Sequence, residues 1–390
     1  MKFNEKTFYA YKFMSECLPI YAFYALLFLE RGQSLSEIAI LIALWGFFAV
    51  VFEIPTGILA DRTNRKILLV IGCLLKGVGF LIWYFSHSFW LFALGFFIWA
   101  LSTSLASGTE ESLIFDSLKQ DNRQEEFIEI YGKVEFFATI GALIGIVSSG
   151  ILVNFFSLGT IALISASISI IDAIFAMNIK GMKLRRDIAS EAKEKILDTF
   201  NSAIRFIKKS KVAFIIIAFL VIVVSLGSYL EEFDALIIAD FELELFWVTV
   251  IFIIRFAFMA LGDLLAPKVE KYLKSMKSII TLAGFGCLLL GLFALLWHPF
   301  AMVIFGFPFL VLAIANVLLV NHLNQEMKEE ARATVMSVVR VGQNFGMIIL
   351  ALAYGWLSGI LDLQYVNLLI ALFGIVTTVV FWFIAKKKVY

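Results

Sequence analysis

Two acidic residues, Glu231 and Asp234, lie within a long apolar stretch of the chain. They are three residues apart, so on a helix both side chains project from the same face. Mutual repulsion and burial favour a bound proton on one of the two carboxyl groups, which is the property that a proton carrier needs. Other acids in apolar stretches complete the set of proton-coupling candidates, which are Glu53, Glu110, Glu111, Glu231 and Asp234.

Two basic residues lie equally deep in other apolar stretches. We expect Arg255 to pair with the acids at 231 and 234, because a desolvated guanidinium is normally matched with carboxylate; recognition of an anion is the alternative. We expect Lys76 to pair with either Glu53 or Asp172, because buried charges are usually partnered.

Helices that span a membrane are the elements that would position these residues. Of the 390 residues, 61% are hydrophobic and 16% charged, and the mean hydropathy of +0.94 is too high for a soluble globule. Runs of about 20 apolar residues can each cross the bilayer as a helix. The sequence predicts an all-α membrane protein with twelve spans, at 8–29, 38–60, 67–86, 89–118, 128–153, 158–178, 211–238, 245–266, 278–297, 299–323, 331–358 and 363–385.

The basic residues of the loops predict the orientation. Lys and Arg gather at both termini and in the even-numbered loops, whereas Arg31 lies in an odd-numbered loop. The positive-inside rule therefore places both termini in the cytoplasm. A polar linker, 179–210, separates a six-helix half, 1–178, from a second one, 211–390, and its middle, 188–207, has the spacing of an amphipathic helix on the membrane surface.

The two halves resemble each other when the chain is shifted by about 205 residues, a parallel repeat that predicts two pseudo-symmetric bundles around a central cavity. The shift aligns Gly57 with Gly262, Leu59 with Leu264, Lys66 with Lys271, and Gly141 with Gly346.

The loop after the second span, Gly57 to Lys66, reads G-I-L-A-D-R-T-N-R-K. Gly57 would let helices approach closely, and Asp61 can face the positive N-terminal end of another helix. The basic residues can anchor the loop at the cytoplasmic surface and pair with acidic helix ends. A role in topology alone is the alternative, but it does not explain the aspartate.

This loop and the twelve-span plan resemble the major facilitator superfamily. The segments Phe52–Gly57 and Ser107–Leu118 resemble a bacterial branch of drug:proton antiporter-like members. Two features depart from drug antiporters: the fifth span keeps its glycines but lacks their proline, and the fourth lacks their arginine. Asn64 replaces the usual loop glycine, and Asn also tolerates left-handed backbone conformations.

The resemblance implies a gate that closes the cytoplasmic side. Arg65 would pair with Asp116, and Asp61 would meet the helix that begins near Ala331. Glu135 and Arg340 are counterparts under the shift, so we expect them to form a bridge between the halves, with Lys133 as a competitor. The expected gating residues are Gly57, Asp61, Arg62, Arg65, Asp116, Glu135 and Arg340.

The resemblance also implies that the first, fourth, seventh and tenth spans line the cavity. Aromatic rings among acids suit a lipophilic cation, whereas packing or contact with lipid is the alternative for each ring. The expected cavity residues are Tyr21, Tyr24, Trp99, Tyr229, Arg255 and Asn316.

The sequence contains no P-loop, no nucleophile elbow and no metal-binding spacing. Its cysteines lie within apolar runs, so we expect them to pack in the helix bundle. We therefore expect neither an enzyme nor a cofactor, metal or nucleic-acid partner. The leading hypothesis is a monomeric transporter of the bacterial cytoplasmic membrane that exports small lipophilic or cationic compounds in exchange for protons. Uptake or exchange of a polar metabolite or lipid-like substrate, and a non-transporting receptor on the same fold, are the alternatives.

Overall fold

The computed structural model describes residues 3–179, 210–326 and 329–388, and the regular structure in these ranges is helical. Backbone contacts divide the chain into two compact units, Met1–Ser190 with Leu245–Thr249, and the remainder. We call these units the N-terminal and C-terminal halves and describe each by itself. The predicted amphipathic helix at 188–207 lies outside the described residues.

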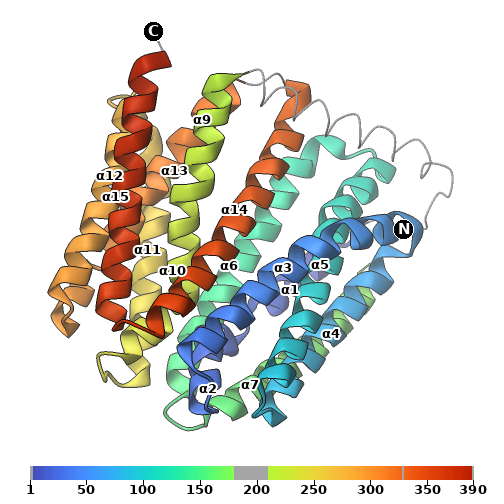
Figure 1. Ribbon diagram of the computed structural model, residues 1–390. Helices are drawn as coiled ribbons and strands as arrows, with labels where there is room; N and C mark the ends of the chain where they lie inside the picture. Colours follow the sequence, from blue (N-terminus) through green and yellow to red (C-terminus); the bar gives the residue numbers. More distant parts are fainter. Residues whose placement is uncertain (1–2, 180–209, 327–328, 389–390) are drawn as a thin grey trace. The chain divides into compact units, whose positions relative to one another are not determined.

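The N-terminal half begins with a broken helix and continues with five long ones (Figure 1). Its elements are α1 (Glu5–Glu16), the 3₁₀ turn η1 (Pro19–Ala22), α2 (Tyr24–Glu30), α3 (Leu35–Arg62), α4 (Arg65–Phe85), α5 (Phe89–Gln120), the 3₁₀ turn η2 (Gln124–Glu126), α6 (Phe127–Leu152) and α7 (Leu158–Asn178). Within this half, α4 packs against α5 and α7, α3 packs against α5, and α1 packs against α6 and α7.

The C-terminal half repeats this plan of six helical spans. Its elements are α9 (Lys211–Phe219), the π-helical turn η4 (Leu220–Val224), α10 (Ser225–Ala239), α11 (Leu245–Glu270), α12 (Met276–Leu296), the 3₁₀ turn η5 (Pro299–Ile304), α13 (Gly306–Glu326), α14 (Glu329–Ser358) and α15 (Leu363–Lys388). Here α12 packs against α13 and α15, and α10 packs against α14.

Eleven helical segments among the described residues are long and apolar enough to cross a membrane. The one other predicted span, the seventh, is the run of α9, η4 and α10, which the π-helical turn interrupts. The twelve-helix architecture therefore agrees with the sequence, although the first and seventh spans are interrupted helices. In the first, Pro19 follows the break because proline has no backbone N–H to continue the helix.

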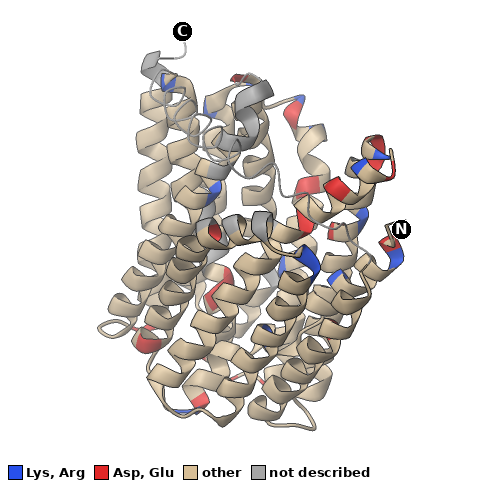
Figure 2. Cartoon of the chain, turned by 90° about the vertical axis from the view of Figure 1, so that its right-hand side faces the viewer, with Lys and Arg blue, Asp and Glu red and all other residues tan. Residues whose placement is uncertain are grey.

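Charged side chains are scarce along the helices, whose ribbons in Figure 2 are mostly tan. Polar side chains instead begin several helices. At α3, the Ser34 hydroxyl accepts from the backbone N–H of Glu37 at 3.2 Å, and the Glu37 carboxylate accepts from the backbone N–H of Ser34 at 2.8 Å. This reciprocal capping box satisfies donors that the first helical turn leaves free.

Glycines let α6 lie directly against the backbone of the first span. A methyl group at Gly141 would overlap the carbonyl group of Phe13, and one at Gly145 would lie 2.8 Å from the backbone nitrogen of Leu18. The two glycines are four residues apart and so share one face of α6. They fix how closely α6 approaches the break between α1 and η1.

The first prediction concerns this contact. Gly141→Ala should destabilise the protein by about 1–3 kcal/mol, because backbone atoms cannot move aside as a flexible side chain can. The thermal unfolding midpoint of the detergent-purified protein should fall by several degrees. Gly132→Ala is the matched control on the same helix, since a methyl group there would meet no atom within 4 Å. An equal midpoint for the two variants would contradict the proposed close contact.

Candidate functional site

A buried cluster of charges in the C-terminal half joins α10 to α11. The guanidinium of Arg255 donates to the Asp234 carboxylate, and both side chains are fully buried. Its Nη2 donates to Glu231 at 3.1 Å and to the backbone oxygen of Gly227 at 3.3 Å. The predicted pairing of Arg255 with the acids of the preceding span is therefore present in the structure.

The helical register explains the cluster. Gly227, Glu231 and Asp234 follow one another at intervals of four and three residues, so they share one face of α10. The Arg255 guanidinium also lies 4.4 Å from the ring centroid of Phe309, a favourable position for a cation over an aromatic face. Nevertheless, Nε of Arg255 and Oδ1 of Asp234 are buried without a hydrogen-bond partner among the described residues. The charges of the cluster are therefore paired, but not all of its buried polar atoms have hydrogen-bond partners.

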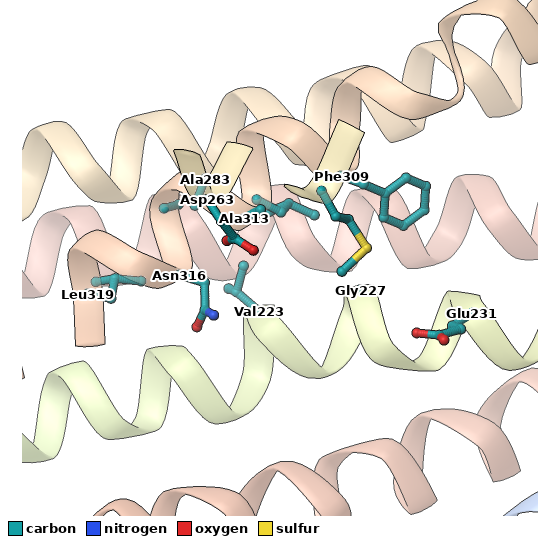
Figure 3. Close-up of a pocket in the computed structure, with 12 residues that line it drawn as sticks. Val223, Gly227, Glu231, Asp263, Ala283, Phe309, Ala313, Asn316 and Leu319 are labelled. Carbon is teal, nitrogen blue, oxygen red and sulfur yellow. The ribbon is translucent and has the colours of Figure 1, made fainter. Parts of the chain in front are cut away.

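A cavity of about 150 Å³ lies beside this cluster, entirely within the C-terminal half. Figure 3 shows the Asp263 carboxylate and the Asn316 amide near each other, with Glu231 farther along α10. The lining residues are Val223, Gly227, Glu231, Met259, Asp263, Ala283, Phe309, Leu312, Ala313, Ala315, Asn316 and Leu319. Glu231 belongs to both the cavity and the cluster, and its side chain is 37% exposed.

Sequence reasoning missed the second acidic residue and the aromatic residue of this lining, Asp263 and Phe309. Asp263 lies near the end of the predicted eighth span, where charges are ordinary, so its position gave little signal. Phe309 gave no signal either, because Phe is abundant in this chain. Of the predicted cavity residues, Asn316 lines the cavity, whereas the side chain of Tyr229 lies outside the described part of the structure.

The predicted proton carrier Glu110 lies in a second polar cluster, in the N-terminal half. Its carboxylate accepts from the Tyr11 hydroxyl and from the Lys12 ammonium, each at 2.8 Å. Lys12 also lies 3.8 Å from Glu16. The sequence analysis did not connect Lys12 with Glu110, because their 98-residue separation leaves no local pattern.

The expected ion pairs of Lys76 are wrong. Its ammonium donates instead to the backbone oxygen of Ser15 at 3.1 Å and to the Tyr21 hydroxyl at 3.2 Å. Asp172 accepts from the Cys73 thiol at 3.3 Å, and its other oxygen has no partner among the described residues. The break between α1 and η1 explains the difference, since it leaves the end of α1 with carbonyl groups that can accept from a cation.

The two remaining acidic candidates lie at the surface of the structure. The side chains of Glu53 on α3 and Glu111 on α5 are exposed, and neither is in an ion pair that the structure describes. The structure thus brings Glu231 and Asp234 together around Arg255 and places Glu110 with Lys12, whereas Glu53 and Glu111 take part in neither set of described ion pairs. Their proposed roles in proton coupling stay predictions.

The predicted aromatic residues Tyr21, Tyr24 and Trp99 come from different elements of the N-terminal half and contact one another. Tyr21 stacks on Trp99, with ring centroids 5.3 Å apart. Tyr24 meets Trp99 edge-on at 6.2 Å, but Tyr24 is buried and packs as part of the core. Tyr21 and Trp99 are only half-buried.

The gating loop contains the expected ion pair. Nη1 of Arg65 lies 2.5 Å from Oδ2 of Asp116 and also donates to the backbone oxygen of Ser112 at 3.0 Å. Asn64 is not left-handed: its backbone is extended, and its side chain caps α4 by accepting from the backbone N–H of Lys66 at 3.1 Å. Among the described residues, a methyl group at Gly57 would meet no atom within 4 Å, and the expected close approach of helices there stays a prediction.

Other gating predictions are not decided by the structure. The side chains of Asp61, Arg62 and Ala331 lie outside its described part. Glu135 and Arg340 are exposed residues of different halves, so their bridge stays a prediction. Lys133 forms its ion pair within α6, with Glu129 at 2.6 Å.

Comparisons with known proteins agree with this architecture. An uncharacterized transporter of Buchnera aphidicola subsp. Acyrthosiphon pisum (strain APS) is 26% identical over 345 residues, 85% of this chain and 82% of that protein. An uncharacterized transporter of Buchnera aphidicola subsp. Baizongia pistaciae (strain Bp) is 23% identical over 366 residues, 91% of this chain and 88% of that protein.

Similar folds occur among solved transporters. The crystal structure of the nucleoside transporter NupG has a TM-score of 0.80 at 16% identity and covers 98% of this chain and 99% of its own. A D-xylose-proton symporter has a TM-score of 0.71 at 12% identity and covers 97% and 96%. The family model described as Major Facilitator Superfamily matches residues 13–329. The chain is therefore a multi-pass membrane protein that belongs to the Major Facilitator Superfamily.

Proposed function

We propose that the chain is a proton-coupled secondary transporter that takes up a small polar organic solute by alternating access. The observation that carries this proposal is the double position of Glu231, which binds Arg255 and also lines the cavity. A carboxyl group in this position can exchange protons with the cavity while it controls a buried cation. The proton and the solute would thus bind at the same cavity, the proton on a residue of its wall.

The charges of the cluster define the coupling step. Arg255 contributes one positive charge, whereas Asp234 and Glu231 contribute two negative charges when both are ionised. A proton on Glu231 neutralises the cluster and weakens its contact with Nη2 of Arg255, while Asp234 continues to hold Nη1. The arrangement of α10 relative to α11 would then depend on the proton, as an alternating mechanism requires.

Polar-solute uptake replaces lipophilic-cation efflux as the leading proposal because the buried acids have basic partners. Glu110 is paired with Lys12, and Asp234 with Arg255. This pairing reduces the excess of negative charge on which the efflux hypothesis depended. The similar solved structures, of a nucleoside transporter and a D-xylose-proton symporter, also favour polar solutes.

Efflux of an organic cation is the second candidate. It is favoured by the joint presence of Glu231, Asp263 and Phe309 in the wall of the cavity, since carboxylates beside an aromatic ring attract cations. Antiport with protons would use the same carboxyl group at Glu231. The direction of transport under an imposed proton gradient distinguishes the two candidates.

We also propose that the protein works as a monomer in the bacterial cytoplasmic membrane with both termini in the cytoplasm. The concentration of Lys and Arg at the termini and in the even-numbered loops supports this orientation. In that orientation the Arg65–Asp116 ion pair lies at the cytoplasmic ends of α4 and α5, where a gate would act.

The second prediction tests proton coupling. In proteoliposomes with an imposed proton gradient, the protein should accumulate at least one member of a radiolabelled panel of nucleosides, pentoses, dipeptides and organic cations. Glu231→Gln should abolish accumulation against the solute gradient, because the amide cannot carry a proton. It should retain exchange of labelled for unlabelled solute, which needs no net proton movement.

Glu244→Gln is the control for this experiment, because Glu244 is an exposed acid that precedes α11 and does not line the cavity. It should accumulate solute as the unchanged protein does. Proton-driven accumulation by Glu231→Gln at the unchanged rate would sink the assignment of Glu231 as the coupling group.

The third prediction tests the gate. Arg65→Ala removes the ion pair with Asp116 and should make cysteines introduced at the cytoplasmic end of α5 react faster with a membrane-impermeant thiol reagent. Lys66→Ala removes the same charge from the same loop without breaking that ion pair, so it should leave the reaction rate unchanged. If both variants raise the rate equally, the loop acts through its total charge and not through the pair.

A further inference from the structure

Three aromatic rings meet in the N-terminal half. Tyr21 comes from η1, Trp45 from α3 and Trp99 from α5. The Tyr21 and Trp99 rings are nearly parallel, at 17° and 5.3 Å between centroids, and Trp45 lies 5.4 Å from Trp99. We call these three residues the aromatic platform.

The three residues of the platform are each partly accessible. Tyr21, Trp45 and Trp99 are all half-buried, whereas the neighbouring Trp83 and Phe80 are fully buried and complete the packing beneath them. Exposed rings alone do not identify a binding site, because aromatic side chains of membrane proteins also face lipid. A second feature is needed to decide between lipid and ligand.

Lys76 provides that feature. Its ammonium lies 5.9 Å from the Tyr21 ring centroid and donates to the Tyr21 hydroxyl and to the backbone oxygen of Ser15. An ammonium group has three donors, so one of them has no acceptor among the described residues. Lys76 has no carboxylate within ion-pair distance among the described residues, although Glu16 and Asp172 interact with its charge from farther away. A lipid-facing surface would not retain such a group, because a charge at membrane depth is costly.

Trp45 adds a second donor at the edge of the platform. Its indole Nε1 is buried and has no hydrogen-bond acceptor among the described residues. Such groups are rare in folded proteins, and an unmet donor invites an explanation in terms of a missing acceptor. Two unmet donors therefore lie beside three rings that can stack.

We propose that the aromatic platform binds a planar aromatic or heteroaromatic ring of the transported solute, and that Lys76 donates to an oxygen atom carried by that ring. Stacking on Tyr21, Trp45 and Trp99 would supply affinity that depends on planarity. Either a carboxylate or a carbonyl oxygen fits this position, since both accept from an ammonium. This inference names the substrate class of the transporter proposed above and rests on that proposal.

Pairs of probes that differ only in ring planarity test the proposal. Benzoate and cyclohexanecarboxylate share a carboxylate, whereas uridine and 5,6-dihydrouridine share carbonyl groups. Binding of each probe to the detergent-purified full-length protein is measured by titration calorimetry. In at least one pair the planar compound should bind about tenfold more tightly than its saturated counterpart, the usual scale of one stacking contact. The pair that shows this preference identifies the oxygen as carboxylate or carbonyl.

Variants locate the effect on the platform. Trp99→Leu should remove the preference for the planar compound, and Trp99→Phe should restore part of it. Trp90→Leu is the matched control, because Trp90 lies on the same helix, is 76% exposed and is not part of the platform. Lys76→Met should weaken binding of the planar compound while thermal unfolding confirms that each variant is folded.

Two results would overturn the proposal: equal binding within both probe pairs, or an unchanged preference in Trp99→Leu. Glu231→Gln separates this inference from the proposed function. It should keep the ring preference in calorimetry even though it loses proton-driven accumulation. A loss of coupling with an unchanged ring preference would therefore support the platform as the binding site of the ring. A loss of ring preference with unchanged coupling in Trp99→Leu would instead support Glu231 as the coupling group.

Discussion

The desolvation of Arg255 is the constraint on which the C-terminal half depends. A guanidinium buried in an apolar helix bundle must be neutralised, and removing one partner of a buried ion pair typically costs about 3–5 kcal/mol. Asp234 and Glu231 meet this requirement from one face of α10, so they fix the rotation of that helix against α11. Because two acids face one base, the cluster contains one acid more than its charge balance requires, and Glu231 is the one beside the cavity. The proposed site for a proton therefore belongs to the same contact that the buried guanidinium requires.

Two of the spans, the first and the seventh, are interrupted helices. The π-helical turn Leu220–Val224 directly precedes α10, and Val223 of this turn lines the cavity. In the N-terminal half, the helix breaks before Pro19, and the backbone oxygen of Ser15 is therefore free to accept from the Lys76 ammonium. Irregular backbone at membrane depth is tolerated only where protein or a cavity satisfies it. Both interruptions accordingly occur beside the polar groups proposed to act in transport.

The sequence predicted the regular part of this structure well. Apolar runs identified the helices, the charges within apolar runs identified the Arg255 cluster, and the family resemblance identified the Arg65–Asp116 pair. It failed where the outcome depends on exact helix rotation or on a broken helix. Lys76 was assigned to Glu53 or Asp172 because depth along a span can be counted, whereas the direction of a side chain cannot. Asp263 and Lys12 were overlooked because each lies near a predicted span end, where charges are ordinary.

The parallel repeat makes the differences between the halves informative. Under the 205-residue shift, Arg255 corresponds to Val50, and Lys76 corresponds to Thr281, so neither buried base has a basic counterpart. A base that was needed only to build the fold would be expected in both copies, since both build the same bundle. Arg255 faces two acids, whereas Lys76 faces a phenol and a carbonyl group. The two halves have therefore diverged in their buried polar chemistry while keeping their shared helical frame, which fits a division between proton coupling and recognition of the solute.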